Sequence, residues 1–462
     1  MQFVKRRRAE IIAVALCGVP LVLWAAAGSI ADRFGDGAST MWSVSIVCGL
    51  VGASAFAVNM ILGARLKFVD TLFHGLDRMY GFHRSVGKAS FFLLVSHGLL
   101  MIASVATVSA DAVVDMLLPG KAGWTVTLGA IALVGLTVLI LITLYARVNH
   151  EEFLWFHRLM GVVFLIGALH AFKTTGTKAT SQVLTYYLGA LMGAGVLAWL
   201  YRSVLGEDLV PRYDYRVSAV NRLDDSVTEL VMTPVDQRLS FVPGQFAFLQ
   251  VESESMRRSF HPVDVVQRGE VAEVTLHTGA AARQAHPFSI TSAPEESELR
   301  VAIKAVGDFT HAVREVEKGD QVRIEGAYGG FSHTNVRNHS QVWIAGGIGI
   351  TPFLSMAASL GSGNYEIDLY YALDDKDQRD FLTRLEAIAA DNPHLEVIPW
   401  FTRGTMNFLK AEDIERRSGG LTGKDFLICG PPPMVRAMVT QLGAKGVPAA
   451  RIHHEAFALA GK

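Results

Sequence analysis

Six apolar runs within the first 205 residues constrain this chain more than any other feature of its sequence. Each run approaches the ~20 residues that an α-helix needs to cross a bilayer, where backbone polar groups must be satisfied inside the segment itself. The sequence therefore predicts six membrane-spanning helices. They cover approximately residues 11–30, 42–64, 86–108, 124–145, 153–172 and 183–201.

Charge divides the chain into two parts and orients the first. Residues 1–205 hold 16 Lys/Arg and 9 Asp/Glu, whereas the rest of the chain holds 26 and 34. Lys and Arg concentrate in cytoplasmic loops, so their distribution predicts a multi-pass protein of the cell (inner) membrane with both termini cytoplasmic. The predicted inner cations are Lys5, Arg6, Arg7, Arg8, Arg65, Lys67, Arg78, Arg84, Arg147 and Arg202; the outer ones are Arg33, Lys121, Lys173 and Lys178.

Composition also excludes some classes of protein. The balance of 42 basic and 43 acidic residues argues against a nucleic-acid partner. Cys17 and Cys48 lie in apolar runs and Cys429 lies far downstream, so no disulfide framework is expected. The N-terminal run resembles a secretory signal, with alanines at 25–27 near its end. Its length and the spans that follow favour an uncleaved first helix, with the lipid membrane as a partner.

Four histidines lie in the predicted third and fifth spans, where ionisable side chains are rare and usually functional. His83 and His97 are 14 residues apart, and His157 and His170 are 13 apart. At about 1.5 Å per residue, these spacings correspond to roughly 21 and 20 Å along a helix. Each pair therefore places one imidazole near the inner surface and one near the outer. Neutral imidazole is a common axial ligand of haem iron, so the two helices predict two haems at different depths.

Two alternatives remain open at this point. A single histidine in such a helix is more often a helix–helix hydrogen-bond partner than a ligand, although matched pairs favour haem. In addition, two side chains fourteen residues apart on a helix point within about 40° of the same direction, whereas two that are thirteen apart point about 140° away from each other. The sequence leaves open whether the fifth helix is overwound or tilted, or whether the haem planes are rotated.

The segments 76–84 through His97 and 153–161 through His170 resemble the ferric reductase and NADPH oxidase superfamily. The resemblance implies that His83 and His157 share an inner haem b, and that His97 and His170 share an outer one.

Arginines follow directly after the two inner histidines. Arg84 and Arg158 suit haem propionates, because guanidinium binds carboxylates in a bidentate fork. Ordinary anchoring at the inner membrane face is the alternative.

From about residue 210 to 333, short alternating strands with turn residues predict a small antiparallel β-barrel. Val242-Pro-Gly-Gln245 and His286-Pro-Phe-Ser-Ile-Thr-Ser292 resemble the flavin-binding strands of ferredoxin-reductase-type proteins. The resemblance implies an FAD domain in which Phe288 forms a wall of the flavin and Gly307 to Thr310 makes a second phosphate contact. Residues 253–283 are longer than is usual there and predict a surface hairpin. The expected FAD ligands are His286, Pro287, Phe288, Ser289, Thr291, Ser292, Gly307 and Thr310.

Residues 338–462 alternate strands and helices and predict an α/β Rossmann-like NAD(P) domain. Gly346-Gly-Ile-Gly-Ile-Thr-Pro352 follows a strand and opens a helix, a pattern that brings backbone N–H groups to a pyrophosphate. The segment 426–434 resembles the family's nicotinamide-side motif, with Cys429 assigned a catalytic position. The closing segment 452–457 resembles one in which an aromatic ring, here Phe457, covers the flavin. The remaining expected ligands are Gly346, Gly347, Gly349, Thr351, Pro352, Gly430, Pro431 and Met434.

The choice of nicotinamide cofactor depends on the end of the strand at 396–401. Thr402 and Arg403 stand where related reductases place a hydroxyl and a cation against the 2′-phosphate of NADPH. Asp374 and Asp375 would repel that phosphate if they lay nearby, and a solvated loop arginine is the alternative. NADPH is favoured and NADH remains open.

Together these parts predict a six-helix transmembrane haem domain (1–205), an FAD barrel (210–333) and an NAD(P) domain (338–462). The resemblance implies a transmembrane oxidoreductase that passes electrons from cytoplasmic NAD(P)H through FAD and two haems b to an outside acceptor. Animal oxygen-reducing members have a further histidine one turn beyond the outer ligand and an arginine near the outer end of the second helix. Here Met101 takes the place of that histidine, and residues 42–58 contain no arginine. The acceptor is therefore open between oxygen and ferric chelates. The alternatives are an electron-supplying subunit for a periplasmic partner protein and, more distantly, a membrane sensor or transporter.

Overall fold

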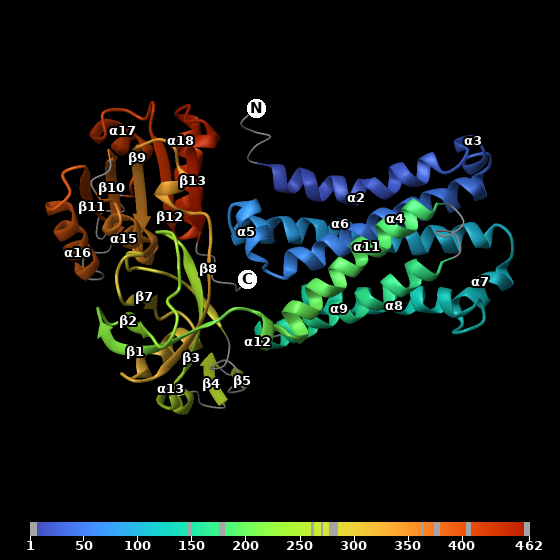
Figure 1. Cartoon of the computed structure of the whole chain (residues 1–462), viewed down its shortest axis with the longest axis horizontal. Coiled ribbons are helices and arrows are strands. Elements are labelled where there is room, and N and C mark those ends of the chain that lie inside the picture. The colour runs from blue at the N-terminus through green and yellow to red at the C-terminus, as the bar shows by residue number, and fades with distance from the viewer. Residues whose placement is uncertain are drawn as a thin grey trace. The chain divides into compact units, whose positions relative to one another are not determined.

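The structure is a computed structural model with two compact units, Met1–Val210 and Pro211–Lys462 (Figure 1). It describes residues 7–145, 150–174, 181–259, 263–268, 271–276, 285–361, 364–373, 379–402 and 408–456.

The first unit is helical. Among its described residues, six helices are long and apolar enough to cross a membrane, which confirms the predicted six spans. Asp36 and Ser181 cap two of them, because each side chain accepts a hydrogen bond from a backbone N–H in the first turn. The helices are α2 (Arg8–Ala26), α3 (Ile30–Arg33), α4 (Gly37–Gly63), α5 (Lys67–Phe73), α6 (Leu76–Ala106), α7 (Ala110–Leu117), α8 (Trp124–Tyr145), α9 (His150–Lys173), α11 (Gln182–Trp199) and α12 (Gly206–Leu209). A π-helical turn, Leu200–Val204, continues α11.

Helix α6 starts ten residues before the predicted span at 86. His74 and Gly75 adopt positive φ angles of 59° and 133° and turn the chain from α5 into α6. The apolar-run criterion misses this first part of α6 because it is polar and aromatic, although it remains helical. His83 therefore lies two turns inside a continuous helix that also carries His97.

The two histidine-bearing helices pack against different neighbours. Helix α6 packs along α4, and α9 packs along α8. Small residues allow the first of these contacts: Gly52 of α4 faces Leu93 and Leu94, and Ser90 Oγ donates a hydrogen bond to Gly52 O at 2.8 Å. Small residues commonly let membrane helices approach closely. The histidines of α6 and α9 therefore project from two separately supported helices.

The second unit begins with an antiparallel six-stranded sheet in the order β6-β3-β8-β1-β2-β7. An isolated bridge between Ile290 and Val301 joins its two edges, so the sheet is nearly closed, as the predicted barrel requires. The strands are β1 (Tyr213–Arg222), β2 (Val227–Pro234), β3 (Phe246–Glu252), β6 (His286–Ser289), β7 (Leu299–Lys304) and β8 (Gln321–Tyr328). Within the long segment 253–283, the described residues form α13 (Glu254–Ser259) and a hairpin of β4 (Val263–Arg268) and β5 (Val271–Leu276). Helix α14 (Asp308–Ala312) follows β7.

A parallel five-stranded sheet follows, in the order β11-β10-β9-β12-β13. The strand order reverses between β9 and β12, which makes their carboxyl ends the topological switch point of this sheet. The strands are β9 (Ser340–Gly346), β10 (Glu366–Leu373), β11 (Leu395–Phe401), β12 (Asp425–Gly430) and β13 (Ile452–Ala456). The helices are α15 (Thr351–Ala358), α16 (Arg379–Ala390), α17 (Ala411–Arg417) and α18 (Pro432–Ala444).

Helices cover both faces of the parallel sheet. The side chains of β9 alternate between the two faces of the sheet. Trp343 lies in the apolar core shared with α15 and α16, and Ile344 lies in the core shared with α17 and α18. Burial on both faces explains why β9 and β12 read as nearly continuous apolar runs. The predicted fold class is therefore confirmed: a six-helix membrane bundle, an antiparallel flavin-domain barrel and a Rossmann-like parallel sheet.

Candidate functional site

The four histidines of the membrane unit form two pairs. The ring centroids of His83 and His157 are 6.1 Å apart, and those of His97 and His170 are 6.4 Å apart. The pairs form despite the 13-residue spacing in α9, with interplanar angles of 67° and 55°. The two spacings are therefore compatible with two paired sets of rings.

Three of these rings are anchored by backbone carbonyls of neighbouring helices. His97 Nδ1 lies 2.9 Å from Ser45 O, and His170 Nδ1 lies 2.7 Å from Thr125 O. His83 Nδ1 lies 3.2 Å from Asn59 O. A carbonyl only accepts, so Nδ1 is the protonated nitrogen in each ring and Nε2 of the neutral imidazole keeps its lone pair. This is the second contact by which proteins usually orient a metal-ligating histidine.

The distance between paired rings fits one metal ion between them. With each nitrogen about 2 Å from the metal and each ring centre about 1.1 Å behind its nitrogen, two trans imidazoles have centroids about 6.2 Å apart. Both observed separations are close to this value. In the described part of the chain, no group of three or more His, Cys, Asp or Glu side chains gathers around a metal site. A porphyrin would supply the remaining ligands of an iron held between two such rings.

Glycines on α4 and α8 give the outer pair its space. A Cβ added at Gly49 would lie 2.8 Å from His97 Nδ1, and one at Gly129 would lie 2.7 Å from His170 Cε1. Sequence reasoning missed these glycines. A signal was nonetheless present on α4: Gly49 and Gly63 are 14 residues apart, the same spacing as His97 and His83.

The inner pair has a different environment. His157 Nδ1 is buried and has no hydrogen-bond partner among the described residues, and its ring stacks on Phe153 with centroids 5.3 Å apart. Arg84 and Arg158 are both exposed, without an ion pair to any described residue. Their guanidinium groups are therefore available to carboxylates such as propionates.

The predicted flavin strand lies at one edge of the barrel sheet, with β6 paired to β3. The Oγ atoms of Ser289 and Thr291 are buried and, among the described residues, have no hydrogen-bond partner. A buried hydroxyl without a hydrogen-bond partner costs folding free energy, so these two hydroxyls fit hydrogen bonds to a bound group. The ring of Phe288 is stacked with that of Phe309, at 6.1 Å and 18°.

The other predicted flavin ligands have more varied surroundings. His286 stacks on Phe309 with centroids 3.8 Å apart, and Pro287 is exposed between it and Phe288. Ser292 Oγ accepts a hydrogen bond from Arg300 N at 3.1 Å. Thr310 Oγ1 is bonded locally, since it accepts from the backbone N–H of Gly307 at 2.9 Å.

The predicted nicotinamide motifs meet at the switch point of the parallel sheet. Gly346 ends β9 and Gly349 lies just after it, whereas Gly430 ends β12, about 80 residues later, and Met434 lies in the first turn of α18. A Cβ at Gly349 would lie 2.5 Å from Cys429 O and 2.6 Å from Gly430 Cα. A Cβ at Gly346 would collide with the Met434 side chain. Only glycine permits this close approach of two loops.

The remaining members of these motifs fall at the same edge. Gly347 has a φ of +53°, which glycine adopts without strain, and it begins the turn that leads into α15. Thr351 and Pro352 occupy the first turn of α15, and Pro431 precedes α18. The motifs are therefore two neighbouring loops at the carboxyl end of the sheet, where nucleotides bind in open α/β folds.

Cys429 has its side chain directed into the core. It is fully buried in the apolar cluster beneath α15, and burial, together with the nearby Glu455, raises the pKa of its thiol well above the ordinary value. A neutral buried thiol is inert, so the part of Cys429 that borders the site is its main chain. Phe457 lies outside the described residues; Ala456, just before it, pairs with Gly430 across β12 and β13.

The residues predicted to select NADPH are described only in part. Thr402 directly follows β11, and its Oγ1 donates to Leu373 O at 3.2 Å. Arg403, Asp374 and Asp375 lie outside the described residues.

Three family models match successive parts of the chain. Residues 48–168 match a ferric reductase like transmembrane component, residues 269–346 match an FAD-binding domain, and residues 343–440 match an oxidoreductase NAD-binding domain.

Curated relatives share part of the chain. The toluate 1,2-dioxygenase electron transfer component of Pseudomonas putida is 24% identical over 253 residues, covering 53% of this chain and 68% of the relative. Sulfhydrogenase 2 subunit gamma of Pyrococcus furiosus is 26% identical, covering 52% and 82%. A flavohemoprotein of Xylella fastidiosa is 23% identical, covering 42% and 52%. Among solved structures, flavohemoglobin from Malassezia yamatoensis aligns with a TM-score of 0.48 and 15% identity over 90% of this chain and 98% of its own.

The matched domains and the strand topology define an NAD(P)H-dependent oxidoreductase with a ferredoxin-reductase-type flavin and nucleotide module. A ferric-reductase transmembrane component precedes that module, so the chain is a multi-pass membrane protein with the architecture of the ferric reductase and NADPH oxidase superfamily.

Proposed function

We propose that this oxidoreductase carries electrons across the cell membrane, from cytoplasmic NADPH through FAD and two haems b to an acceptor on the outer side. The observation that carries the proposal is the pairing of four histidine rings at separations of 6.1 and 6.4 Å, at two depths of one bundle. His83 and His157 would hold the inner haem, and His97 and His170 the outer one.

The bound groups supply the redox chemistry and the chain supplies its geometry. When bound, FAD would supply an acceptor for the hydride of NAD(P)H and a donor of single electrons, and haem iron would supply a one-electron couple. Backbone carbonyls keep the Nδ1 protons of three histidines in place, which would leave each Nε2 free to bind iron. Arg84 and Arg158 would neutralise propionates near the inner haem.

In the soluble unit, the hydroxyls of Ser289 and Thr291 would hydrogen-bond the ribityl chain and pyrophosphate of FAD, with Phe288 as a wall of the flavin site. The loop 346–349 would hold the pyrophosphate of the nicotinamide cofactor at the beginning of α15. Phe457 would cover the flavin until nicotinamide displaces it. The domain limits 1–205, 210–333 and 338–462 belong to the same proposal.

Haem content tests the membrane part directly. Protein extracted in detergent is expected to contain two haems per chain with bis-histidine absorption spectra. Fewer than two, or spectra without two nitrogen ligands, would contradict the proposal. A preparation without haem would instead favour a sensor or transporter.

The acceptor is addressed by anaerobic reduction of the purified protein with NADPH, followed by addition of oxygen or ferric citrate. Re-oxidation with formation of superoxide or ferrous iron supports a self-contained oxidase or ferric-chelate reductase. A protein that is reduced but transfers its electrons to neither compound supports the alternative of a subunit that supplies a periplasmic partner protein.

The preference for NADPH is tested at Arg403. Replacing it with alanine is expected to raise the KM for NADPH more than that for NADH, because only NADPH carries the 2′-phosphate. Equal effects on both cofactors would contradict this assignment.

A further inference from the structure

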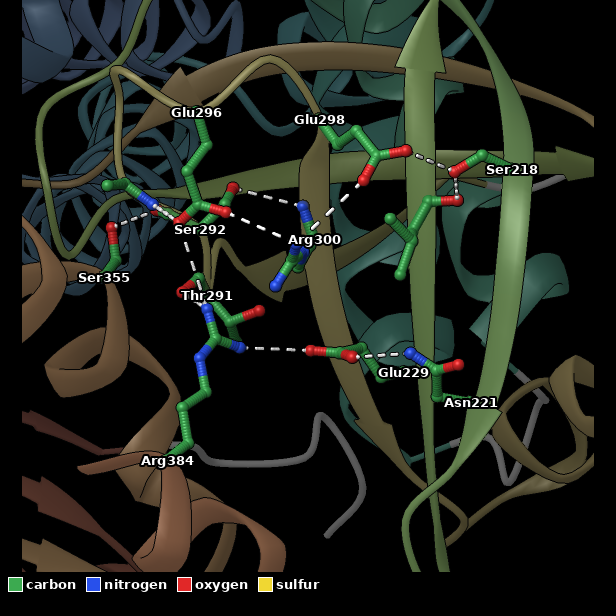
Figure 2. A network of polar contacts seen from close by, with 12 residues as sticks. Ser218, Asn221, Glu229, Thr291, Ser292, Glu296, Glu298, Arg300, Ser355 and Arg384 are labelled. Atoms are coloured by element: carbon green, nitrogen blue, oxygen red, sulfur yellow. Dashed lines mark hydrogen bonds and ion pairs between the residues drawn. The ribbon is translucent and has the colours of Figure 1, made fainter. Parts of the chain in front are cut away.

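Two consecutive carbonyls of the proposed flavin strand are held by side chains from the nucleotide domain (Figure 2). Ser355 Oγ of α15 donates a hydrogen bond to Ser292 O at 2.7 Å, and Arg384 Nη2 of α16 donates to Thr291 O at 3.3 Å. Thr291, Ser292 and Ser355 are each 0% exposed. The bond from Ser355 is wholly buried and does not compete with water, whereas the Arg384 side chain is 24% exposed and its bond is only partly shielded.

Arg384 also contacts two carboxylates of the barrel, as Figure 2 shows. Its Nη1 lies 3.2 Å from Glu229 Oε1 on β2, and its Nη2 lies 3.9 Å from Glu296 Oε1, in the loop before β7. Glu229 is nearly buried and is oriented by Asn221, whose Nδ2 donates to Glu229 Oε2 at 3.0 Å. One guanidinium therefore joins strand β2 and the connection between β6 and β7 to helix α16.

The other contact leads directly to the nucleotide loop. Ser355 lies one turn after Thr351, in a short helix that begins at the end of the glycine loop and is almost wholly buried. Around the two contacts, Phe331 and Ala302 of the barrel belong to the same apolar core as Phe353 of α15. Helix α15 thus forms a stiff connection from the loop proposed to bind the nicotinamide cofactor to the strand proposed to bind FAD.

We propose that Ser355 and Arg384 are positioning residues that set the distance between nicotinamide and flavin for hydride transfer. They act through the carbonyls of Ser292 and Thr291. The inference rests on the flavin and nucleotide sites proposed above. The reaction they align moves one hydride, with both its electrons, from NAD(P)H to FAD and leaves NAD(P)⁺. A misplacement of about 1 Å can reduce such a rate by about 10²-fold.

The test uses the full chain loaded with FAD, with the variants Ser355→Ala, Arg384→Gln and Arg384→Lys. Flavin reduction by saturating NADPH is followed anaerobically in a stopped-flow spectrometer, with NADPH carrying protium or deuterium at the transferred position. For Ser355→Ala and Arg384→Gln we expect a reduction rate at least about tenfold lower and a larger isotope effect, with FAD content and KM nearly unchanged. Arg384→Lys should have a higher rate than Arg384→Gln, because lysine keeps the positive charge but lacks the several N–H donors of the guanidinium group.

Arg417→Gln is the matched control, since Arg417 forms an exposed ion pair with Glu396 at 3.4 Å within the same domain. It should reduce flavin at the wild-type rate. Wild-type rates in Ser355→Ala and Arg384→Gln would overturn the proposal. A rate that falls only in proportion to lost FAD would also overturn it, because the role would then be structural. A wild-type protein that binds no FAD, or whose FAD is not reduced, would instead contradict the proposed function.

Discussion

The outer and inner histidine pairs are similar in ring separation but different in support. Both outer rings donate to backbone carbonyls, at 2.9 and 2.7 Å, and each faces a glycine that leaves no space for a Cβ. Of the inner rings, only His83 has such an anchor among the described residues, at 3.2 Å, and a Cβ added at Gly63 would lie 3.6 Å from its Cε1, an ordinary van der Waals distance. His157 depends on stacking with Phe153.

This difference shows that one ligand type can be held by two physical means. The outer site is fixed by close helix contacts and hydrogen bonds, which tolerate little change in volume. The inner pair has one hydrogen-bond anchor and one aromatic stack, and there is more space between Gly63 and His83. We therefore expect substitutions at corresponding positions to affect the outer haem more than the inner one.

The largest effect is expected from removing a ligand. His97→Leu should lower the haem-to-protein ratio from two toward one and abolish reduction of external acceptors, while NADPH still reduces the flavin. Haem quantitation and a stopped-flow assay check this. His83→Leu, the inner counterpart, should also stop external reduction but leave the outer haem spectrum. Normal turnover in His97→Leu would refute the pairing of His97 with His170.

A matched pair of glycine variants tests the difference in space more sharply. Gly49→Ala places a Cβ 2.8 Å from His97 Nδ1, whereas Gly63→Ala places one 3.6 Å from His83 Cε1. Overpacking at Gly49 should cost about 1–3 kcal/mol and weaken retention of the outer haem. Gly63→Ala should be nearly neutral. Equal haem loss in both variants, measured by titration with a chemical denaturant, would remove the proposed difference between the sites.

A smaller effect is expected from the aromatic stack of the inner site. Phe153→Leu removes the ring that stacks on His157, with a loss of about 0.5–1.5 kcal/mol. The inner haem should dissociate at a lower denaturant concentration, and the outer haem should not change. Separate bleaching of the two haem spectra provides the measurement, and a change confined to the outer haem would contradict the prediction.

The smallest effect is expected at Ser45. Its Oγ lies 3.0 Å from His97 Nδ1 and donates to His97 O at 2.9 Å. Ser45→Ala removes these contacts but keeps the backbone carbonyl that anchors the ring. We expect full haem content and a small shift in the outer haem's midpoint potential, measured by spectroelectrochemical titration. Loss of the outer haem would mean that the hydroxyl, rather than the carbonyl, orients His97.

Short sequence patterns predicted much of the fold, because helix and strand formation depend mainly on interactions between residues that are close in the sequence. The apolar runs predicted six spans, since a helix in lipid must satisfy its own hydrogen bonds. The beginning of α6 was missed because its polar first turns carry no apolar signal. The motif at 346–352 was predicted to hold a pyrophosphate, but the close approach of Gly349 to Cys429 O could not be predicted, since 80 residues separate them.

By itself, the sequence determined the order and class of the matched domains and the number of membrane helices, because these depend on composition and short-range pattern. Only the tertiary structure decided that a 13-residue and a 14-residue spacing yield two matched ring pairs, that Gly49 and Gly129 make room for them, and that Ser355 and Arg384 reach the flavin strand. Those features depend on where side chains from distant segments meet, and contact distance is a property of the packed molecule rather than of the chain.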